Sequence, residues 1–399
     1  MNKLETPPLE QIATRWTVDY GSGEIELTMV GGSTVRRPLD DFVAGSHGSI
    51  LGASFNVVEG HVELDFSFNE TVCLDVGPQE VPEVPVAYLD QNKWISLAQS
   101  KYAPQRLRKK ERELLPRLYE MAANRQVLLP ISSSHMIEAA YKDGRPRQKL
   151  ATVMLELSRG WQMLNPLKVR LDEFLSALEN AFDRRVDSSA QRPTVTLDPG
   201  ALFSTPANPL PGGWSEIKER LSWAEAFADL FVEDEREADP LALAKANRWA
   251  SIYSETGEQI RAESNSQQKR RAMVKHAVIS DLSGELFTAC GLLGIPEDEA
   301  LQWAMEADFR SEQMPSTNLL FEITLRRLSS KDHHWKKNDL NDLTFLCCAA
   351  ANCDLVLAEN ATSHDLRDAQ RHTPSKAKIC RNLEELISDI ERFPGSRHE

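Results

Sequence analysis

The stretch from Asn338 to Asn360, NDLNDLTFLCCAAANCDLVLAEN, decides how the whole chain is interpreted. It opens with Asp339 and Asp342, one turn apart, in front of an apolar, alanine-rich segment that predicts a buried helix. LVLA, residues 355–358, then predicts a short buried strand, and Glu359 follows it directly. Acids at both ends of so apolar a segment need an explanation.

Strand and helix patterns alternate on both sides of this stretch. VAYL (86–89) and QVLLP (126–130) predict strands, and helical patterns follow at 132–140, 150–161 and 167–182. After the stretch, KIC (378–380) predicts another strand, and Asn382 and Glu385 have capping-box spacing at the start of a last helix. This order is typical of an α/β fold with a parallel sheet and flanking helices.

The remaining segments suggest four parts. Residues 1–80 alternate apolar and polar side chains between glycine turns, which predicts a small antiparallel β module. The α/β domain then has a first part at 82–190 and a second part at 331–399. Between them, 191–330 begins with a Pro/Gly/Thr-rich connector and continues as a mainly helical insertion.

Composition places few limits on function. The chain has 399 residues, 41% of them hydrophobic, and a formal net charge of −14, which argues against a uniform coat of nucleic acid. Its six cysteines form no CxxC pair, and the three at 347, 348 and 353 are expected to be buried thiols. The first residues have no apolar leader and no run is long enough to cross a membrane, so we expect a cytoplasmic protein without membrane contact.

Four acids occupy the positions where parallel α/β sheets bind ligands, at strand ends and the adjoining helix starts. They are Asp90, Glu138, Asp342 and Glu359. Each has an ordinary explanation as well: helix capping for Asp342, an Asx turn with Asn92 for Asp90, a solvated side chain for Glu138 and a turn acid for Glu359. Together at one edge they would repel each other unless a hard cation such as Mg²⁺ or Mn²⁺ lay between them.

These residues resemble the PIN-like domain of metal-dependent nucleases. YLDQNKWI (88–95) is similar to the family's opening strand with its aspartate, SSSHMIEAA carries Glu138 as the second acid, and Asp342 begins the alanine-rich helix of the third. Glu359 stands at the fourth position, where aspartate is commoner. The segment that begins at Met314 is very similar to a bacterial branch of the family; it reads MPSTNLLFEITLRRLSSKDHHWKKNDLNDL. The resemblance covers roughly 82–185 and 314–399.

The resemblance implies a nuclease that hydrolyses phosphodiester bonds with Mg²⁺ or Mn²⁺. Asp90, Glu138 and Asp342 would hold the metal, with Glu359 and Asp339 completing the shell. A nucleic acid is the implied partner, and RNA is placed ahead of DNA by the resemblance alone. No P-loop and no Ser/His/Asp or Cys/His pattern suggests a different chemistry.

Substrate binding is assigned to Asn92, Trp335, Lys336 and Lys337, the last three just ahead of the third acid. Asn92 could instead orient Asp90 or the attacking water. Further basic residues occur at 106–112, at 331 and at 267–275, and these are also explained as solvated helix faces. His333 and His334 are as well explained as surface residues as ligands.

Two other functions stay open at this point. A degenerate, non-catalytic PIN-like protein would bind RNA or protein, and another phosphoester hydrolase would cleave small phosphomonoesters. The β module is a candidate surface for a protein partner, and self-association into a homo-oligomer stays open.

Overall fold

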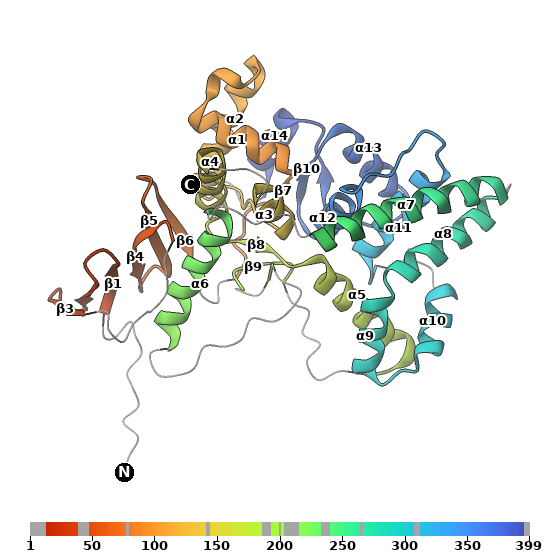
Figure 1. The fold of residues 1–399 in the computed structure, drawn as a ribbon, viewed down its shortest axis with the longest axis horizontal. Helices are drawn as coiled ribbons and strands as arrows, with labels where there is room; N and C mark the ends of the chain where they lie inside the picture. Colours follow the sequence, from red (N-terminus) through yellow and green to blue (C-terminus); the bar gives the residue numbers. More distant parts are fainter. Residues whose placement is uncertain are drawn as a thin grey trace, which may run out of the picture.

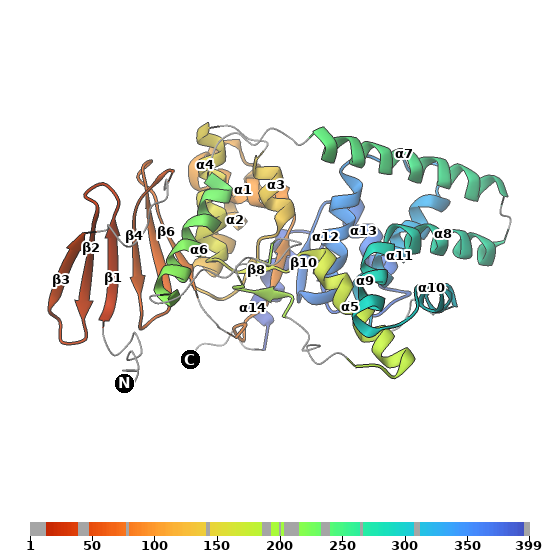
Figure 2. The same ribbon diagram turned by 60° about the horizontal axis from the view of Figure 1, so that its bottom comes forward.

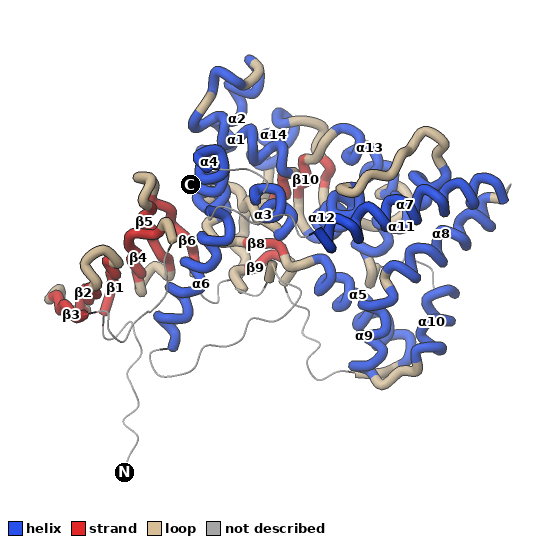
Figure 3. The backbone as a smooth tube through the Cα atoms, in the orientation of Figure 1, coloured by secondary structure: helices blue, strands red, loops and turns tan. Residues whose placement is uncertain are grey.

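Two sheets of different kind, with helices around the second, make up the computed structural model (Figures 1 and 2). The structure describes residues 13–38, 48–76, 80–140, 144–185, 193–198, 201–202, 215–232, 240–263, 266–306 and 312–394. Figure 3 shows the strands of the first sheet at one end of the molecule and helices alone at the other, with the small second sheet between them.

The N-terminal sheet is antiparallel and has six strands in the order β3-β2-β1-β4-β5-β6. Their bounds are Ala13–Asp19 (β1), Glu24–Met29 (β2), Thr34–Pro38 (β3), Ile50–Asn56 (β4), His61–Phe66 (β5) and Thr71–Asp75 (β6). Alternation buries one face, so Trp16 and Val18 of β1 point into the core between exposed neighbours. The predicted antiparallel β module is confirmed.

This sheet packs onto helices of the following region rather than standing alone. Trp16, Phe55 and Leu64 belong to the same apolar cluster as Trp94 and Phe231, which lie in α1 (Gln91–Tyr102) and α6 (Ser215–Val232). Where the sheet meets these helices, the buried carboxylate of Asp75 accepts hydrogen bonds from Arg159 and Arg125 at 2.9 and 3.0 Å. Arg159 follows the end of α4 (Gly144–Ser158), and Arg125 follows the end of α2 (Lys109–Ala123). One core therefore runs through both parts.

The second sheet is parallel, with three strands in the order β11-β10-β7. These are Ala87–Leu89 (β7), Leu355–Leu357 (β10) and Lys378–Ile379 (β11). Leu357 of β10 pairs with Leu89 of β7, so both strands end at the same level. Parallel strands buried on both faces read as continuous apolar runs, which is why VAYL and LVLA could be identified.

The prediction of a full strand at Gln126–Pro130 is wrong, because only a single bridge forms there. Only Leu128 pairs with Val86, through bonds of its amide to Pro85 O and of its carbonyl to Ala87 N, both 2.9 Å. The next bond of a parallel ladder would need an amide hydrogen on residue 130, and Pro130 has none. The segment therefore lies along the sheet edge without extending it.

Three helices pack directly on the parallel sheet: α12 (Asp339–Asn352) and α14 (Leu383–Arg392) on β10, and α13 (Asn360–Ala369) on β11. The other helices of this region are α1, α2, α3 (Ser133–Ala140), α4 and α5 (Pro166–Phe182). A short helix at Pro104–Arg106 joins α1 and α2, and β8 (Gln162–Met163) pairs with β9 (Val195–Thr196) in a separate antiparallel ribbon. The predicted cap of α14 is present, because Asn382 Oδ1 accepts from Glu385 N at 3.0 Å.

The described residues of 191–330 are mainly helical, but they do not pack as one unit. Besides α6, it holds α7 (Pro240–Glu263), α8 (Gln267–Asp281), α9 (Ser283–Leu293), α10 (Glu297–Glu306) and α11 (Pro315–Ser329). α6 packs on α4 and the N-terminal sheet, whereas α11 packs on α12. Buried Glu173 of α5 accepts the amides of Ser316 and Thr317 at the start of α11, at 2.7 and 3.0 Å. Most of the predicted connector, 191–213, lies outside the described residues.

Among the helices that the structure describes, none combines the length and the apolar character needed to cross a bilayer.

Candidate active site

Asp90 links the ends of the two central strands. It follows β7 directly, and its own amide bonds to Leu357 O at the end of β10, at 3.0 Å. Its Oδ1 accepts from Asn92 N at 2.7 Å and so caps α1, while its Oδ2 accepts from Glu359 N at 3.0 Å. Burial raises the pKa of Asp90, the Asn92 amide counteracts this, and the charge of Glu359 raises it further. The predicted Asx turn is present, and the same carboxylate also joins two segments.

Asp342 lies in the first turn of α12, and its negative charge is offset only in part, by the charge of Arg327. Its carboxylate accepts no hydrogen bond from any residue that the structure describes. The residue is reached by solvent, yet it lies in a cleft, and desolvation by the surrounding protein raises its pKa to about 6, with further contributions from Asp90, Asp339 and Glu359. Burial and like charges thus act in the same direction on this group.

Glu138 reaches the same region from α3. It is half-buried, and Ser134 Oγ, one turn earlier, donates to its Oε1 at 3.4 Å. The helix is held to β7 by His135, whose Nδ1 accepts from Ser132 N at 3.1 Å. Because Leu89 O can only accept, the His135 Nε2 2.8 Å away carries the proton. Burial lowers the pKa of His135 to about 3, so the ring is neutral at physiological pH.

Glu359 is the N-cap residue of α13, although its side chain does not bond to the first turn of that helix. Instead, Asn92 Nδ2 donates to Glu359 Oε1. Asn92 was assigned to substrate binding, and the structure uses its backbone amide for Asp90 and its side chain for Glu359. The residue therefore fixes the two acids relative to each other, which is closer to the orienting role considered for it.

The four acids line one cleft of about 230 Å³. Asp90 comes from the end of β7, Glu138 from α3, Asp342 from α12 and Glu359 from the turn after β10. The cleft lies at the carboxyl ends of the parallel strands, where open α/β sheets bind ligands. Its other lining residues are Tyr88, Gln91, Asn92, Ser134, His135, Asn338, Phe345, Leu346 and Thr362.

The structure does not bring Asp339 into the lining of this cleft, although it was expected to complete the metal shell. Asp339 Oδ2 accepts from Lys336 N at 2.8 Å and lies 3.7 Å from His333 Nε2, while Oδ1 lies 3.7 Å from Arg327 Nη1. Burial alone would raise the pKa of Asp339, but His333, the Lys336 amide and Arg327 together lower it. Asp339 is therefore engaged in closing the loop before α12.

The residues assigned to substrate binding ahead of α12 do not line the cleft either. Trp335 packs edge-on against Trp249 and Tyr253 of α7, with ring centroids 5.2 and 5.0 Å apart, and is half-buried. Lys336 and Lys337 are exposed on the same loop. The physical reason is that α7, far away in the sequence, offers Trp335 an aromatic partner that the local sequence does not reveal.

Two residues of the cleft were missed by sequence reasoning. Gln91 is 7% exposed, and neither its side-chain nitrogen nor its oxygen has a hydrogen-bond partner among the described residues. An orphaned buried amide is costly unless a ligand or water completes it. His135 was also overlooked, since nothing local shows that it bonds to Leu89. The only sequence signal for Gln91 was its place directly after Asp90.

The donor chemistry of the cleft fits a hard divalent cation. Carboxylate oxygens from Asp90, Glu138, Asp342 and Glu359, with the unpartnered oxygen of Gln91, are ligands of the type that Mg²⁺ and Mn²⁺ take. Within the described ranges, no group of three or more His, Cys, Asp or Glu side chains stands in an arrangement that could hold a metal ion. Glu138 and Glu359 are held by Ser134 and Asn92, so these side chains would have to turn to share an ion.

Comparison with protein-family models, with curated proteins and with solved structures gave no match to this chain.

Proposed function

We propose that this protein is a metal-dependent nuclease with a PIN-like α/β domain, which hydrolyses phosphodiester bonds and prefers RNA. One observation carries the proposal: four acids from four separate segments line a single cleft at the carboxyl edge of the parallel sheet. The order of these acids along the chain matches that of the family resembled. The preference for RNA over DNA rests on that resemblance alone.

The charge state of the cleft supports a cation as its partner. Asp342 has no hydrogen-bond donor among the described residues, and desolvation together with three nearby acids raises its pKa to about 6, so its ionised form is destabilised. A bound Mg²⁺ or Mn²⁺ would relieve that repulsion, activate a water for attack on phosphorus and stabilise the leaving oxygen. Asp90, Glu138, Asp342 and Glu359 would hold the ion, and the Gln91 amide would bond to a water or a phosphate oxygen.

The chain's own residues would organise this site before substrate arrives. Asp90 is oriented by two backbone amides and Glu359 by Asn92, which lowers the entropy lost when an ion binds. His135, neutral and buried, holds α3 against the end of β7 and so keeps Glu138 in the same cleft as Asp90. Because its pKa is near 3, His135 would serve as a positioning residue and not as an acid or base.

The test is a cleavage assay on labelled RNA and DNA with Mn²⁺ or Mg²⁺. Asp90→Asn and Asp342→Asn keep the side-chain size and remove the charge, and each is expected to lower the rate by about 100-fold or more. Asp332→Asn is the matched control, because Asp332 is an exposed aspartate outside the cleft lining. Cleavage that survives in both cleft variants would contradict the assignment.

A second candidate function is a non-catalytic PIN-like protein that binds RNA. The bond from Asn92 to Glu359 favours it, because a carboxylate already held by an amide is less available to a metal. Titration calorimetry with Mn²⁺ separates the two functions. Binding that is lost in Asp342→Asn supports the nuclease, and no binding to the wild type supports the alternative.

A further inference from the structure

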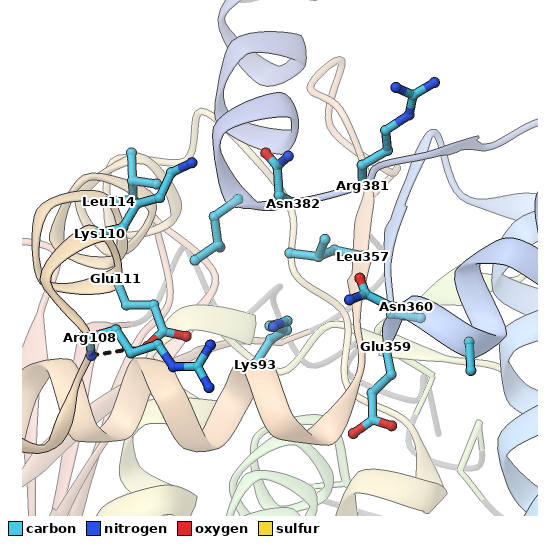
Figure 4. A pocket seen from close by; sticks show the side chains of 13 residues that line it. Lys93, Arg108, Lys110, Glu111, Leu114, Leu357, Glu359, Asn360, Arg381 and Asn382 are labelled. Carbon is cyan, nitrogen blue, oxygen red and sulfur yellow. Dashed lines mark hydrogen bonds between the residues drawn. The ribbon is translucent and has the colours of Figure 1, made fainter.

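A second, larger cleft adjoins the acid cleft and shares Glu359 with it. It has a volume of about 550 Å³ and lies between α1, α2, α13 and α14, above the end of β10 (Figure 4). Its lining residues differ in charge from those of the acid cleft: Lys93, Arg108, Lys110 and Arg381 stand around it. Figure 4 shows Arg108 and Lys110 on one side of the cleft and Arg381 on another, with Lys93 at its base.

Three of these four cations form no ion pair among the described residues. Lys110 pairs with Glu384 at 2.7 Å, but Lys93, Arg108 and Arg381 form no ion pair with any residue that the structure describes. The carboxylate of Glu111, which also lines the cleft, is used by the Arg108 amide at 3.2 Å. Lys93 and Arg381 are close enough to carboxylates to make a lowering contribution to the pKa of Asp90 and of Glu385, but neither forms an ion pair among the described residues. Cations gathered in one concave site attract an anion more strongly than the same cations on a flat surface.

Helix geometry adds to this positive field. α2, α13 and α14 all begin at this cleft, and their starts contribute Arg108, Glu359 and Asn382 to its lining. The first amides of a helix have no partner within it and carry partial positive charge. Glu359 does not cap α13 with its side chain, so the amides of that helix start remain available.

The lining also indicates which part of a ligand would be recognised. It contains Leu114, Leu357 and Leu383 but no aromatic residue, so it offers no platform on which a base could stack. Guanidinium groups and helix amides are the usual partners of phosphate oxygens. The chemistry on offer is therefore that of a phosphate site.

We propose that this cleft binds a phosphate group of the substrate strand, next to the phosphate that lies at the acid cleft, through Lys93, Arg108 and Arg381. The inference rests on the proposed function for its substrate class. Glu359, which lines both clefts, would then lie between the site of cleavage and the site that binds the neighbouring phosphate. The same chemistry would accept a free phosphate or a mononucleotide, so the experiment separates these sources.

The experiment measures binding without cleavage. The full chain with Asp342→Asn is titrated, in EDTA, into a fluorescein-labelled single-stranded RNA of about 12 nucleotides, and anisotropy is followed between about 50 and 200 mM salt. Arg108→Gln with Arg381→Gln is expected to weaken binding by about 10-fold or more. Each lost phosphate contact should also flatten the slope of log K against log salt by about 0.7.

Arg112→Gln is the matched control, because Arg112 is exposed in the first turn of α2, four residues after the N-cap Arg108, and does not line the cleft. It should bind RNA as the parent does. Unchanged affinity and salt slope in the double variant would overturn the proposal. Circular dichroism checks that the exposed substitutions leave the fold intact.

A second arm titrates inorganic phosphate and adenosine monophosphate into the same proteins by calorimetry. RNA binding that depends on the two arginines, without arginine-dependent binding of either small ligand, supports a strand phosphate. Small-ligand binding with the same arginine dependence, and none for RNA, overturns the strand and leaves a free-phosphate site. Because no divalent ion is present, arginine-dependent RNA binding can hold even where the cleavage assay fails.

Discussion

At the scale of single residues, the acid cleft concentrates negative charge around Asp342. Asp90 accepts two backbone amides and Glu359 accepts Asn92, whereas Asp342 accepts nothing from the described residues. Asp339, only three positions away, is compensated by Arg327 and His333. The two aspartates at the start of α12 thus have pKa values shifted in opposite directions, lowered for Asp339 and raised to about 6 for Asp342.

The raised pKa of Asp342 predicts a defined pH dependence of stability. Between its ordinary value of 3.8 and about 6 the folded state binds more protons than the unfolded state, so this group lowers stability as pH rises through that window. Asp342→Asn should therefore stabilise the protein at pH 7 by on the order of 1 kcal/mol, a figure discounted for solvent screening. Urea unfolding at several pH values measures it.

The gain from Asp342→Asn should vanish below about pH 4, where the wild-type carboxyl is protonated as well. Asp332→Asn, at an exposed position, should leave the curve unchanged. A stabilisation of the same size at all pH values would mean that the charge of Asp342 is not its cause.

At the scale of elements, α3 is the part that positions Glu138, and its attachment to β7 depends on few groups. His135 bonds to Leu89 O and Ser132 N and stacks on Tyr88 with ring centroids 5.0 Å apart. Tyr88 Oη and Ser132 Oγ lie 3.0 Å apart. All these groups are buried, so each unsatisfied partner would cost free energy.

Replacing His135 tests this attachment. His135→Ala leaves the Leu89 carbonyl and the Ser132 amide without partners and opens a cavity, so unfolding free energy should fall by roughly 2–4 kcal/mol. His135→Gln should recover part of the loss, since an amide can still donate to Leu89. Urea unfolding gives the stability, and calorimetry with Mn²⁺ shows whether affinity falls with it.

His334→Ala is the control, because His334 is exposed on the loop before α12. It should change stability by less than about 0.5 kcal/mol. If His135→Ala were equally silent, the link between α3 and β7 would not depend on this ring.

At the scale of the whole molecule, the N-terminal sheet and the α/β region share one core. The sheet's inner face packs against α4 and α6, and buried Asp75 is paired with Arg159 at 2.9 Å. α6 belongs by sequence to the helical insertion, yet it lies beside the sheet, as both ribbon views show. The parts expected from the sequence are therefore not the parts that pack together, since a helix of the insertion packs with the N-terminal sheet.

Removing residues 1–79 tests whether this shared core is needed. Each large apolar side chain that loses its cover forfeits about 1.5–3 kcal/mol, and several do so at once. Against a total stability of about 5–15 kcal/mol, we expect the shortened chain to lose cooperative unfolding and to bind a hydrophobic dye. Circular dichroism melting and dye fluorescence measure this.

Val35→Thr in the full chain is the control, because Val35 lies on the exposed edge strand β3 and does not face α6. It should melt as the wild type does. A shortened chain with the same melting temperature as the full chain would show that the sheet is an independent unit.

Local signals account for much of what could be predicted. Alternation identified the antiparallel sheet, apolar runs identified β7 and β10, and the caps of α1 and α14 follow from Asp90 and Asn382. The sequence placed four acids at the ends of predicted elements, and in the structure these acids line one cleft. They are Asp90, Glu138, Asp342 and Glu359. Periodicity and capping depend on residues that are neighbours in the sequence, so they can be predicted from the sequence alone.

Long-range contacts decided the rest. Asp339 and Asp342 look equivalent at the start of α12, but His333, the Lys336 amide and Arg327 compensate the charge of Asp339. Asp342 accepts no hydrogen bond among the described residues, and Arg327 offsets its raised pKa only in part. Trp335 packs against aromatic residues of α7 and so does not line the acid cleft. The second cleft, with its lysines and arginines, forms where three helices begin close together. By itself, then, the sequence determined the elements and the edge where acids gather. Which charges remain unpaired there was set by the tertiary structure, because pairing depends on residues brought together from distant parts of the chain.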